Sequence, residues 1–303
     1  MTLAITGATG FVGQALLDAA ARAGTPVRAL TRRPQEPREG VEWVAGGLSD
    51  RAALAELVKG AAAVIHVAGL TNTPDPREFE QANVAGTVAL LEAARDAGTG
   101  RFVFVSSLSA REPALSTYGA SKARAEEYVQ TSGFDWTIAR PPAVYGPRDS
   151  DMFELFRAAK FGVVPMPPRG RTSLIHVDDL AECLLALVPG GAGVTGACLE
   201  PDDGRDGGYE HGELAQAIGR SVGRRRVFAP HLPAGALGLA ARADRLLRGD
   251  KARLTPDRVG YMCHPDWIAR SDCAVPSAIW QPRIGGEEGL AATAKWYRAA
   301  GWL

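Results

Sequence analysis

The stretch that decides the fold is Thr6-Gly7-Ala8-Thr9-Gly10-Phe11-Val12-Gly13, close to the N-terminus. It follows the apolar run of residues 3–5 and opens an amphipathic pattern over residues 12–23, so it predicts a strand, a glycine turn and a helix. Glycines let the turn approach a pyrophosphate, and the N-terminus of the helix offers free N–H groups to it. We therefore predict that a dinucleotide contacts Gly7, Thr9, Gly10, Phe11, Val12 and Gly13.

The same alternation of short apolar runs and helical patterns continues through the first half of the chain. Apolar strands separated by amphipathic helices imply a parallel sheet that is covered on both faces. We therefore predict an α/β protein with a Rossmann-type, doubly wound parallel sheet. The expected strands are residues 3–5, 27–30, 62–67, 102–105 and 136–139, and the expected helices are 12–23, 51–59 with Asp50 as N-cap, 79–97 and 118–131.

The pattern loosens after Pro141, where prolines and glycine-rich stretches interrupt it. We expect a dinucleotide-binding domain over residues 1–165 and a smaller C-terminal lobe, mainly substrate-binding, over residues 166–303. Residues 174–188 have the pattern of one more strand and helix, so we expect residues 171–190 to return to the main sheet.

The second expected strand ends in Leu30-Thr31-Arg32-Arg33, without an acid at its tip. An Asp or Glu near this place hydrogen-bonds the ribose 2′-OH of NAD, whereas a guanidinium suits the 2′-phosphate of NADP. We therefore expect NADP in preference to NAD, with Arg32 and Arg33 as contacts to the phosphate. The alternative is a pair of solvated arginines and NAD as the cofactor.

Tyr118 and Lys122 lie four residues apart in an expected helix, so their side chains share one face. A phenol with a pKa near 10 is a poor base at neutral pH, but a nearby ammonium favours the phenolate. Tyrosine in such a setting exchanges a proton with a substrate oxygen. The helix follows a strand that ends in Ser106-Ser107, and this position favours a catalytic role over an ordinary exposed helix.

Together these motifs resemble the extended branch of the short-chain dehydrogenase/reductase superfamily, which includes NAD-dependent epimerases and dehydratases. The glycine turn matches the TGxxGxxG motif of that branch, and residues 118–122 match its YxxxK motif. Residues 83–87, 140–147 and 176–179 match its NVxGT, RPxxVYGP and HVDD segments. The resemblance is dense over residues 1–190 and thin beyond them.

The resemblance implies a catalytic set of Ser107, Tyr118 and Lys122, in which Ser107 rather than Ser106 hydrogen-bonds the substrate oxygen. Gly47 stands where the family has an adenine-binding Asp, so that contact is expected to be missing, and His66 is expected to be a packing residue. The further cofactor contacts that the resemblance implies are Leu48, Ala68, Gly69, Asn83, Tyr118, Lys122, Pro141 and Val144.

Two departures from the family's sugar-nucleotide epimerases bear on the reaction. Those enzymes commonly have Asn at the position of Ala143 and a diphosphate-binding Arg at the position of Thr172, although Arg148, Arg169 and Arg171 remain as substitutes. We therefore expect an NAD(P)-dependent oxidoreductase, closer to the hydroxysteroid dehydrogenases, that transfers hydride between a nicotinamide and a secondary alcohol or ketone. The alternatives are a nucleotide-sugar epimerase or dehydratase and a non-catalytic dinucleotide-binding subunit or regulator, although relatives of the last kind typically lose the Tyr or the Lys.

The composition is that of an ordinary globular protein, with 46% hydrophobic and 22% charged residues. The 34 basic and 34 acidic residues cancel, so charge gives no reason to expect nucleic acid or a membrane as a partner, and the run Arg224-Arg225-Arg226 is expected to be a solvated turn. The four cysteines form no CxxC pair, so we expect reduced thiols and no metal site. Without a signal or anchor pattern we expect a cytoplasmic protein with a small-molecule substrate, and a homodimer is one option.

Overall fold

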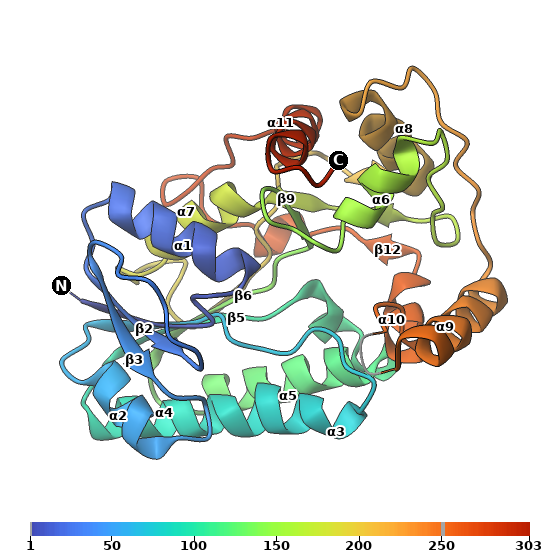
Figure 1. The fold of residues 1–303 in the computed structure, drawn as a ribbon. Helices are drawn as coiled ribbons and strands as arrows, with labels where there is room; N and C mark the ends of the chain where they lie inside the picture. The colour runs from blue at the N-terminus through green and yellow to red at the C-terminus, as the bar shows by residue number, and fades with distance from the viewer. Residues whose placement is uncertain (1, 250–251) are drawn as a thin grey trace. The chain divides into compact units, whose positions relative to one another are not determined.

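A seven-stranded sheet contains the strand that leads into the glycine turn (Figure 1). Its strand order is β10-β6-β5-β4-β1-β2-β3, and every neighbouring pair is parallel. The order reverses between β1 and β4, which is the switch point where doubly wound sheets bind ligands. The predicted fold class is thus confirmed. The strands are β1 (Leu3–Thr6), β2 (Val27–Thr31), β3 (Val41–Ala45), β4 (Ala63–His66), β5 (Arg101–Val105), β6 (Asp135–Ala139) and β10 (Ala197–Leu199).

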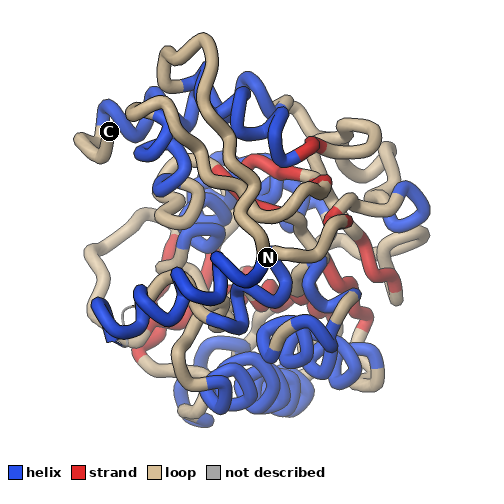
Figure 2. Tube along the Cα trace, turned by 90° about the vertical axis from the view of Figure 1, so that its right-hand side faces the viewer, coloured by secondary structure: helices blue, strands red, loops and turns tan. Residues whose placement is uncertain are grey.

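Helices cover both faces of this sheet (Figures 1 and 2). Helix α1 lies on one face, and α2, α4 and α5 lie on the other, where Leu54, Leu57 and Leu90 pack with Phe102 and Phe104 of β5 in a dry core. The helices are α1 (Phe11–Arg22), α2 (Arg51–Val58), α3 (Pro76–Phe79), α4 (Gly86–Asp96) and α5 (Thr117–Gln130), with 3₁₀ turns η2 (Leu108–Arg111) and η3 (Pro113–Leu115).

Most expected elements of this region are present within one or two residues of their predicted bounds, and Asp50 caps α2 by accepting a hydrogen bond from Ala53 N at 3.1 Å. The expected helix over 79–97 is different. It begins earlier, as α3, and passes through a π-helical turn, η1 (Glu80–Ala85), before α4. Strands β3 and β10 were not predicted.

The structure is a computed structural model, and it describes residues 2–249 and 252–303. The chain divides into two compact units. The first unit comprises Met1–Pro141, Ala181–Glu200 and Val275–Gln281, and it contains the seven-stranded sheet. The second comprises Pro142–Leu180, Pro201–Ala274 and Pro282–Leu303.

The second unit has its own core, in which Tyr145, Phe156 and Tyr297 are fully buried. Two small sheets belong to it, one pairing β7 (Ala143–Tyr145) with β9 (Leu174–His176), the other ordered β11 (Tyr209–Glu210), β8 (Arg171–Thr172), β12 (Asp266–Trp267). Its helices are α6 (Phe153–Ala159), α8 (His211–Ser221), α9 (Ala234–Arg248), α10 (Pro256–Met262) and α11 (Gly286–Ala299), with the 3₁₀ turn η5 (Ser271–Cys273).

Helix α7 (Val177–Ala186) begins in the second unit and ends in the first. The strand before it, β9, pairs with β7 instead of joining the main sheet, and β10 is the strand that adds to the main sheet beside β6. In the described part of the chain, no helix has the length and apolar character needed to span a membrane.

Candidate active site

The glycine turn is packed tightly at two of its three glycines. Gly7 has φ of +71°, and a Cβ on it would lie 2.6 Å from the backbone nitrogen of Ala68. A Cβ on Gly13 would lie 2.1 Å from the carbonyl oxygen of Gly7. Gly10 is exposed, and its Cβ would meet only that same oxygen, at 3.3 Å. Gly7 and Gly13 are therefore required by the packing of the backbone, while Gly10 is exposed and has a single tight contact.

Helix α1 begins directly after this turn and has an uncapped N-terminus. Gly10 is its N-cap and offers no side chain, so the first N–H groups and the positive end of the helix dipole point outward. Thr9 is exposed, and Phe11 and Val12 are half-buried. An anionic pyrophosphate fits this N-terminus, because Gly10 has no side chain to cover the backbone N–H groups that the phosphates would approach.

The tip of β2 presents two exposed guanidinium groups. Neither Arg32 nor Arg33 forms an ion pair within residues 2–249 and 252–303. Thr31 fixes the turn, because its hydroxyl donates to Arg33 O at 2.7 Å. The aliphatic part of the Arg32 side chain lies beside Gly47. Leu48 packs against Gly86 at the start of α4, where a Cβ on Gly86 would lie 2.7 Å from Leu48 Cδ1.

A buried histidine joins the carboxyl ends of β1 and β4. Thr87 Oγ1 donates to Asn83 O at 2.6 Å, so it accepts from His66 Nε2 at 2.9 Å, and His66 Nδ1 accepts from Thr6 Oγ1 at 2.6 Å. Thr6 Oγ1 in turn accepts from Ala68 N at 3.2 Å. Burial, together with the charge of Lys122, lowers the pKa of His66 to about 3. His66 is therefore neutral and packed, and it holds the backbone after β4 against the glycine turn.

Tyr118 and Lys122 lie in the first turns of α5, which begins at Thr117 behind the N-cap Ser116. Both side chains are buried. Lys122 Nζ donates to Val105 O at the end of β5 at 2.7 Å and lies 4.2 Å from the centre of the Phe104 ring. Tyr118 packs beside Phe79, with the ring centres 5.9 Å apart. The helix thus holds the phenol and the ammonium at the carboxyl edge of the sheet.

Burial also changes the pKa of the Lys122 ammonium group. Desolvation lowers the pKa of Lys122 to about 8, and the carboxylate of Glu126, one turn further along α5, acts in the opposite direction. A Cβ on Gly69 would lie 3.7 Å from Lys122 Nζ and 3.2 Å from Asn83 Oδ1. The ammonium therefore lies beside the loop that follows β4.

Asn83 fixes that loop from the π-helical turn η1. Its Oδ1 accepts from Leu70 N at 2.7 Å, and its Nδ2 donates to Leu70 O at 3.0 Å and to Ser121 Oγ at 2.9 Å. Ser121 Oγ donates in turn to Tyr118 O at 2.7 Å. Asn83 thereby links the loop containing Ala68 and Gly69 to the helix that carries Tyr118.

The two serines after β5 have different environments. Ser106 is buried and donates to Glu126, whose carboxylate also binds the guanidinium of Arg140. Ser107 is half-buried and is the N-cap of η2, where its hydroxyl accepts from Ser109 N at 3.2 Å. Only Ser107 is placed toward the accessible side of the strand end. Glu126 was missed from the sequence, although its spacing of four residues from Lys122 on the helix was a usable signal.

The last two expected cofactor contacts lie on different units. Pro141 follows β6 in the first unit, and its carbonyl accepts from Leu108 N at 3.1 Å, next to Ser107. Val144 lies in β7 of the second unit, paired with Ile175. The other expected contacts all belong to the first unit, and the strand ends bring the turn, the β4 loop, Ser107 and α5 to one edge of the sheet.

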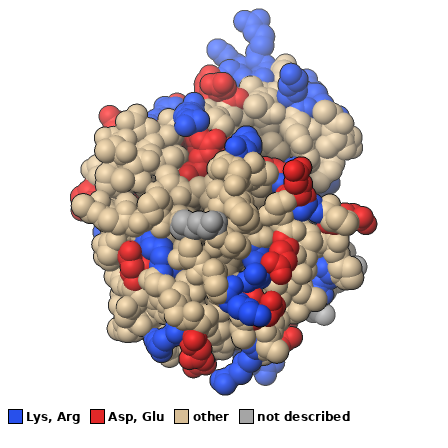
Figure 3. All heavy atoms as spheres, turned by 90° about the vertical axis from the view of Figure 1, so that its left-hand side faces the viewer, with Lys and Arg blue, Asp and Glu red and all other residues tan. Residues whose placement is uncertain are grey.

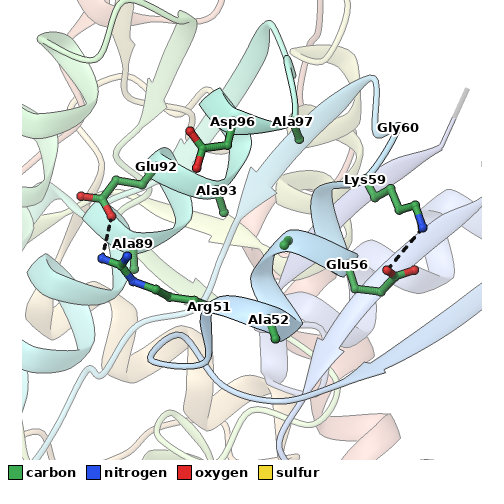
Figure 4. Close-up of a pocket in the computed structure, with 11 residues that line it drawn as sticks. Arg51, Ala52, Glu56, Lys59, Gly60, Ala89, Glu92, Ala93, Asp96 and Ala97 are labelled. Carbon is green, nitrogen blue, oxygen red and sulfur yellow. Dashed lines mark hydrogen bonds and ion pairs between the residues drawn. The ribbon is translucent and has the colours of Figure 1, made fainter.

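A surface groove of about 610 Å³ lies elsewhere on this unit, between α2 and α4 (Figure 4). The ion pairs Arg51–Glu92 and Lys59–Glu56 lie along it, and alanines of both helices line it. None of the expected site residues lines it. Within the described residues, no cluster of three or more His, Cys, Asp or Glu side chains is arranged to hold a metal ion.

Comparisons with known proteins extend these observations. Residues 3–195 match the family described as the NAD dependent epimerase/dehydratase family. The ceramide reductase of Caulobacter vibrioides is 39% identical over 99% of this chain and 96% of its own length. The 2-alkyl-3-oxoalkanoate reductase of Stenotrophomonas maltophilia is 29% identical over 96% of this chain and 97% of its own.

A solved structure shares the fold over the same extent. MoeE5 in complex with UDP-glucose and NAD superposes with a TM-score of 0.77 at 24% identity, and 99% of each chain is covered. The fold is therefore common to proteins whose bound molecules include a sugar nucleotide, while the two similar relatives are reductases by name.

Proposed function

Since the chain belongs to the NAD-dependent epimerase/dehydratase family, within the extended short-chain dehydrogenases/reductases, we propose that it reduces a ketone on a lipid-like substrate through Ser107, Tyr118 and Lys122. The chain is an NAD(P)-dependent reductase acting on a small molecule. The residues that act, the substrate and the choice between NADPH and NADH form the proposal.

One observation carries the catalytic assignment. Lys122 is buried beside Gly69, with its ammonium anchored to Val105 O, one helical turn from Tyr118 and next to the strand end that bears Ser107. Burying an ammonium without an ionised hydrogen-bond partner is costly, and such costs are usually found where a charge is needed.

Different residues of the proposed site bind the cofactor, orient the substrate and transfer the proton. The glycine turn and the N-terminus of α1 would hold the pyrophosphate, Arg32 and Arg33 a 2′-phosphate, and Lys122 the ribose; the bound dinucleotide supplies the hydride. Ser107 donates a hydrogen bond to the carbonyl oxygen. Tyr118 gives its proton to that oxygen as the carbon is reduced, and the Lys122 ammonium stabilises the phenolate that remains until solvent returns the proton.

The substrate class rests on the relatives and on one pair of residues. Two reductases similar over the whole chain are named for ceramide and for 2-alkyl-3-oxoalkanoate, both molecules with alkyl chains. The diphosphate-binding position of the epimerases is Thr172 here, and the neighbouring Arg171 is already engaged, since it donates to Gly207 O at 2.6 Å and pairs with Glu210 at 3.5 Å. Of the three arginines that could replace the diphosphate-binding residue, Arg171 is thus already engaged, and together with the two relatives this favours a ketone substrate over a sugar diphosphate.

The cofactor preference rests on the tip of β2. Arg32 and Arg33 are exposed, and no acidic side chain pairs with either among the described residues. A free guanidinium at this place suits a 2′-phosphate, so we infer that NADPH is preferred to NADH.

The decisive experiment follows NADPH oxidation by absorbance with the 3-oxo lipid amide whose reduction gives a ceramide, and with UDP-glucose as the competing substrate. We expect turnover of the keto lipid and no epimerisation of UDP-glucose. Tyr118→Phe removes one oxygen and keeps the ring, so the rate should fall by about 10²–10⁴-fold while NADPH still binds.

Three results contradict the proposal. They are an undiminished rate in Tyr118→Phe, conversion of UDP-glucose to its epimer, and tight cofactor binding without turnover across a wide panel of ketones. The last result would favour a dinucleotide-binding regulator.

A further inference from the structure

Two neighbouring loops of the second unit expose aromatic rings among cationic side chains. Phe161 is 81% exposed and Phe228 is 69% exposed, although both are large apolar residues. They lie in the loops that follow α6 and α8. We name this region the Phe161–Phe228 surface, and it consists of Lys160, Phe161, Val163, Arg224, Arg225, Arg226 and Phe228.

The backbone holds these residues on one face. The loops run parallel to each other, with Val163 and Phe228 bridged, Phe228 N donating to Gly162 O at 2.8 Å and Val164 N donating to Phe228 O at 2.9 Å. Val164 and Val227 point into the core. Since side chains alternate along extended backbone and Val163 and Phe228 are paired, these two side chains project to the outside together. Phe161 lies in the turn just before Val163, where its ring is exposed.

The two loops that carry the rings have charged side chains of one sign only. No acid occurs between Glu154 and Asp178, or between Glu213 and Asp244. Lys160, Arg225 and Arg226 form no ion pair in the part of the chain that the structure describes, while Arg224 donates to Lys160 O and ties the loops together. Figure 3 shows Lys and Arg intermingled with Asp and Glu over the face that it presents, with Lys and Arg side chains projecting at its upper edge.

A small cavity adjoins the surface and adds a second cationic feature. It measures about 220 Å³ and is lined by Lys160, Val222, Arg298 and Leu303. Arg298 donates to Ser221 O at 3.1 Å, which fixes its guanidinium beside α8. Lys160 and Arg298 thus add positive charge next to the surface.

We propose that the Phe161–Phe228 surface docks the protein on an anionic membrane. Aromatic rings enter the boundary between headgroups and acyl chains, and the flanking arginines bind the negative surface. A second copy of this chain suits the surface poorly, because a two-fold contact would bring Arg224, Arg225 and Arg226 toward themselves. From the arginine run alone we expected a solvated turn and no membrane partner. The proposal departs from this expectation because exposed aromatic rings lie beside the run.

The test measures binding of the full chain to vesicles by cosedimentation. Vesicles of mixed phosphatidylglycerol and phosphatidylcholine should bind the protein, pure phosphatidylcholine vesicles should not, and added salt should weaken binding. The triple change Arg224→Ser, Arg225→Ser, Arg226→Ser should weaken binding by roughly a hundredfold. The pair Phe161→Ser, Phe228→Ser should weaken it about tenfold or more.

The matched control is Leu246→Ser with Leu247→Ser, on α9. These leucines are 87% and 85% exposed in the same unit and also lie among arginines, yet they are outside the surface. The control pair should bind vesicles like the wild type. NADPH affinity should be equal in all variants, which checks the fold without relying on the proposed substrate.

Three outcomes overturn the proposal. They are no binding to the anionic vesicles, loss of binding in the α9 pair with none in the phenylalanine pair, and a dimer in sedimentation velocity that the phenylalanine pair dissociates. The last outcome would make the surface an interface between copies. A failed reductase assay would leave the vesicle result intact, so the two proposals fail separately.

Discussion

Lys122 combines a buried charge with a position that the proposed chemistry needs. Its pKa is lowered to about 8 by burial, against an ordinary value of 10.5. Between those two pH values the unfolded chain holds more protons than the native protein, so the free energy of unfolding rises with pH across this window. Below pH 8 the native state bears the full cost of the buried ammonium.

Replacing this residue should separate stability from activity. Lys122→Met keeps the apolar stem and removes the charge, but it also loses the hydrogen bond to Val105 O, so at pH 7 we expect the free energy of unfolding to rise by less than about 3 kcal/mol. The difference should shrink as pH rises from about 8 to 10.5. Turnover should collapse and NADPH affinity should fall. Urea denaturation at pH 7 and pH 10, the NADPH oxidation assay and cofactor titration measure stability, turnover and affinity in turn.

Lys59→Met, at the exposed C-cap of α2, is the matched control and should change stability by less than about 0.5 kcal/mol. A Lys122→Met protein that is no more stable at pH 7 than the wild type would contradict the cost assigned to the buried charge.

The arginines at the tip of β2 carry the prediction on cofactor choice. The double change Arg32→Ser, Arg33→Ser should lower NADPH affinity about tenfold or more and leave NADH affinity nearly unchanged, because only NADPH has the 2′-phosphate. Fluorescence titration of both cofactors measures this, with Arg51→Ser on the surface of α2 as control. Wild-type protein that binds NADH as tightly as NADPH would refute the preference.

Among the elements, the turn from β1 into α1 offers a matched pair of glycine variants. A Cβ on Gly13 would lie 2.1 Å from backbone, whereas a Cβ on Gly10 meets the chain only at 3.3 Å. Gly13→Ala should therefore destabilise the fold. Gly10→Val should leave the melting temperature close to that of the wild type and abolish cofactor binding, because its side chain fills the approach to the phosphates. Melting curves with and without NADPH distinguish the two, and a Gly10→Val protein that NADPH still stabilises would contradict the assignment.

Periodicity predicted the elements whose burial is uniform and missed those whose burial is not. Strands β1, β4 and β5 are wholly buried and appear as apolar runs. Strand β3 is an edge strand with Glu42 and Ala45 exposed, so its sequence lacks such a run. Strand β10 follows a glycine-rich stretch that indicated a loop. The π-helical turn leaves the hydrophobic spacing of residues 79–97 almost unchanged, so periodicity could not show it.

The candidate site could also be predicted only in part, because sequence patterns show where strands end but not which distant side chains meet. Residues that follow parallel strands meet at one edge, so Ser107 and Gly69 could be placed from strand order alone. His66 hydrogen-bonds to Thr6, 60 positions earlier in the chain, and to Thr87, 21 positions later. No local sequence pattern reveals these partners. Their partners depend on the register of β1 against β4, which only the structure provides.

For the molecule as a whole, 34 basic and 34 acidic residues give no net charge at pH 7. Proteins with little net charge associate most readily, so we expect the solubility of the protein to be lowest near pH 7 and to rise on either side. Precipitation by polyethylene glycol from pH 5.5 to 8.5 measures this. A steady rise or fall of solubility with pH, without a minimum, would contradict it.

The chain has no net charge at pH 7, yet the Phe161–Phe228 surface gives one face of the second unit a local excess of positive charge. The acids that balance Arg224, Arg225 and Arg226 must lie elsewhere, since none occurs between Glu213 and Asp244. A negatively charged plane exerts almost no net pull on such a molecule from afar, but it exerts a torque that turns the positive end toward the plane within about a Debye length. Orientation would then precede adhesion, and the protein would arrive with Phe161 and Phe228 already facing the lipid.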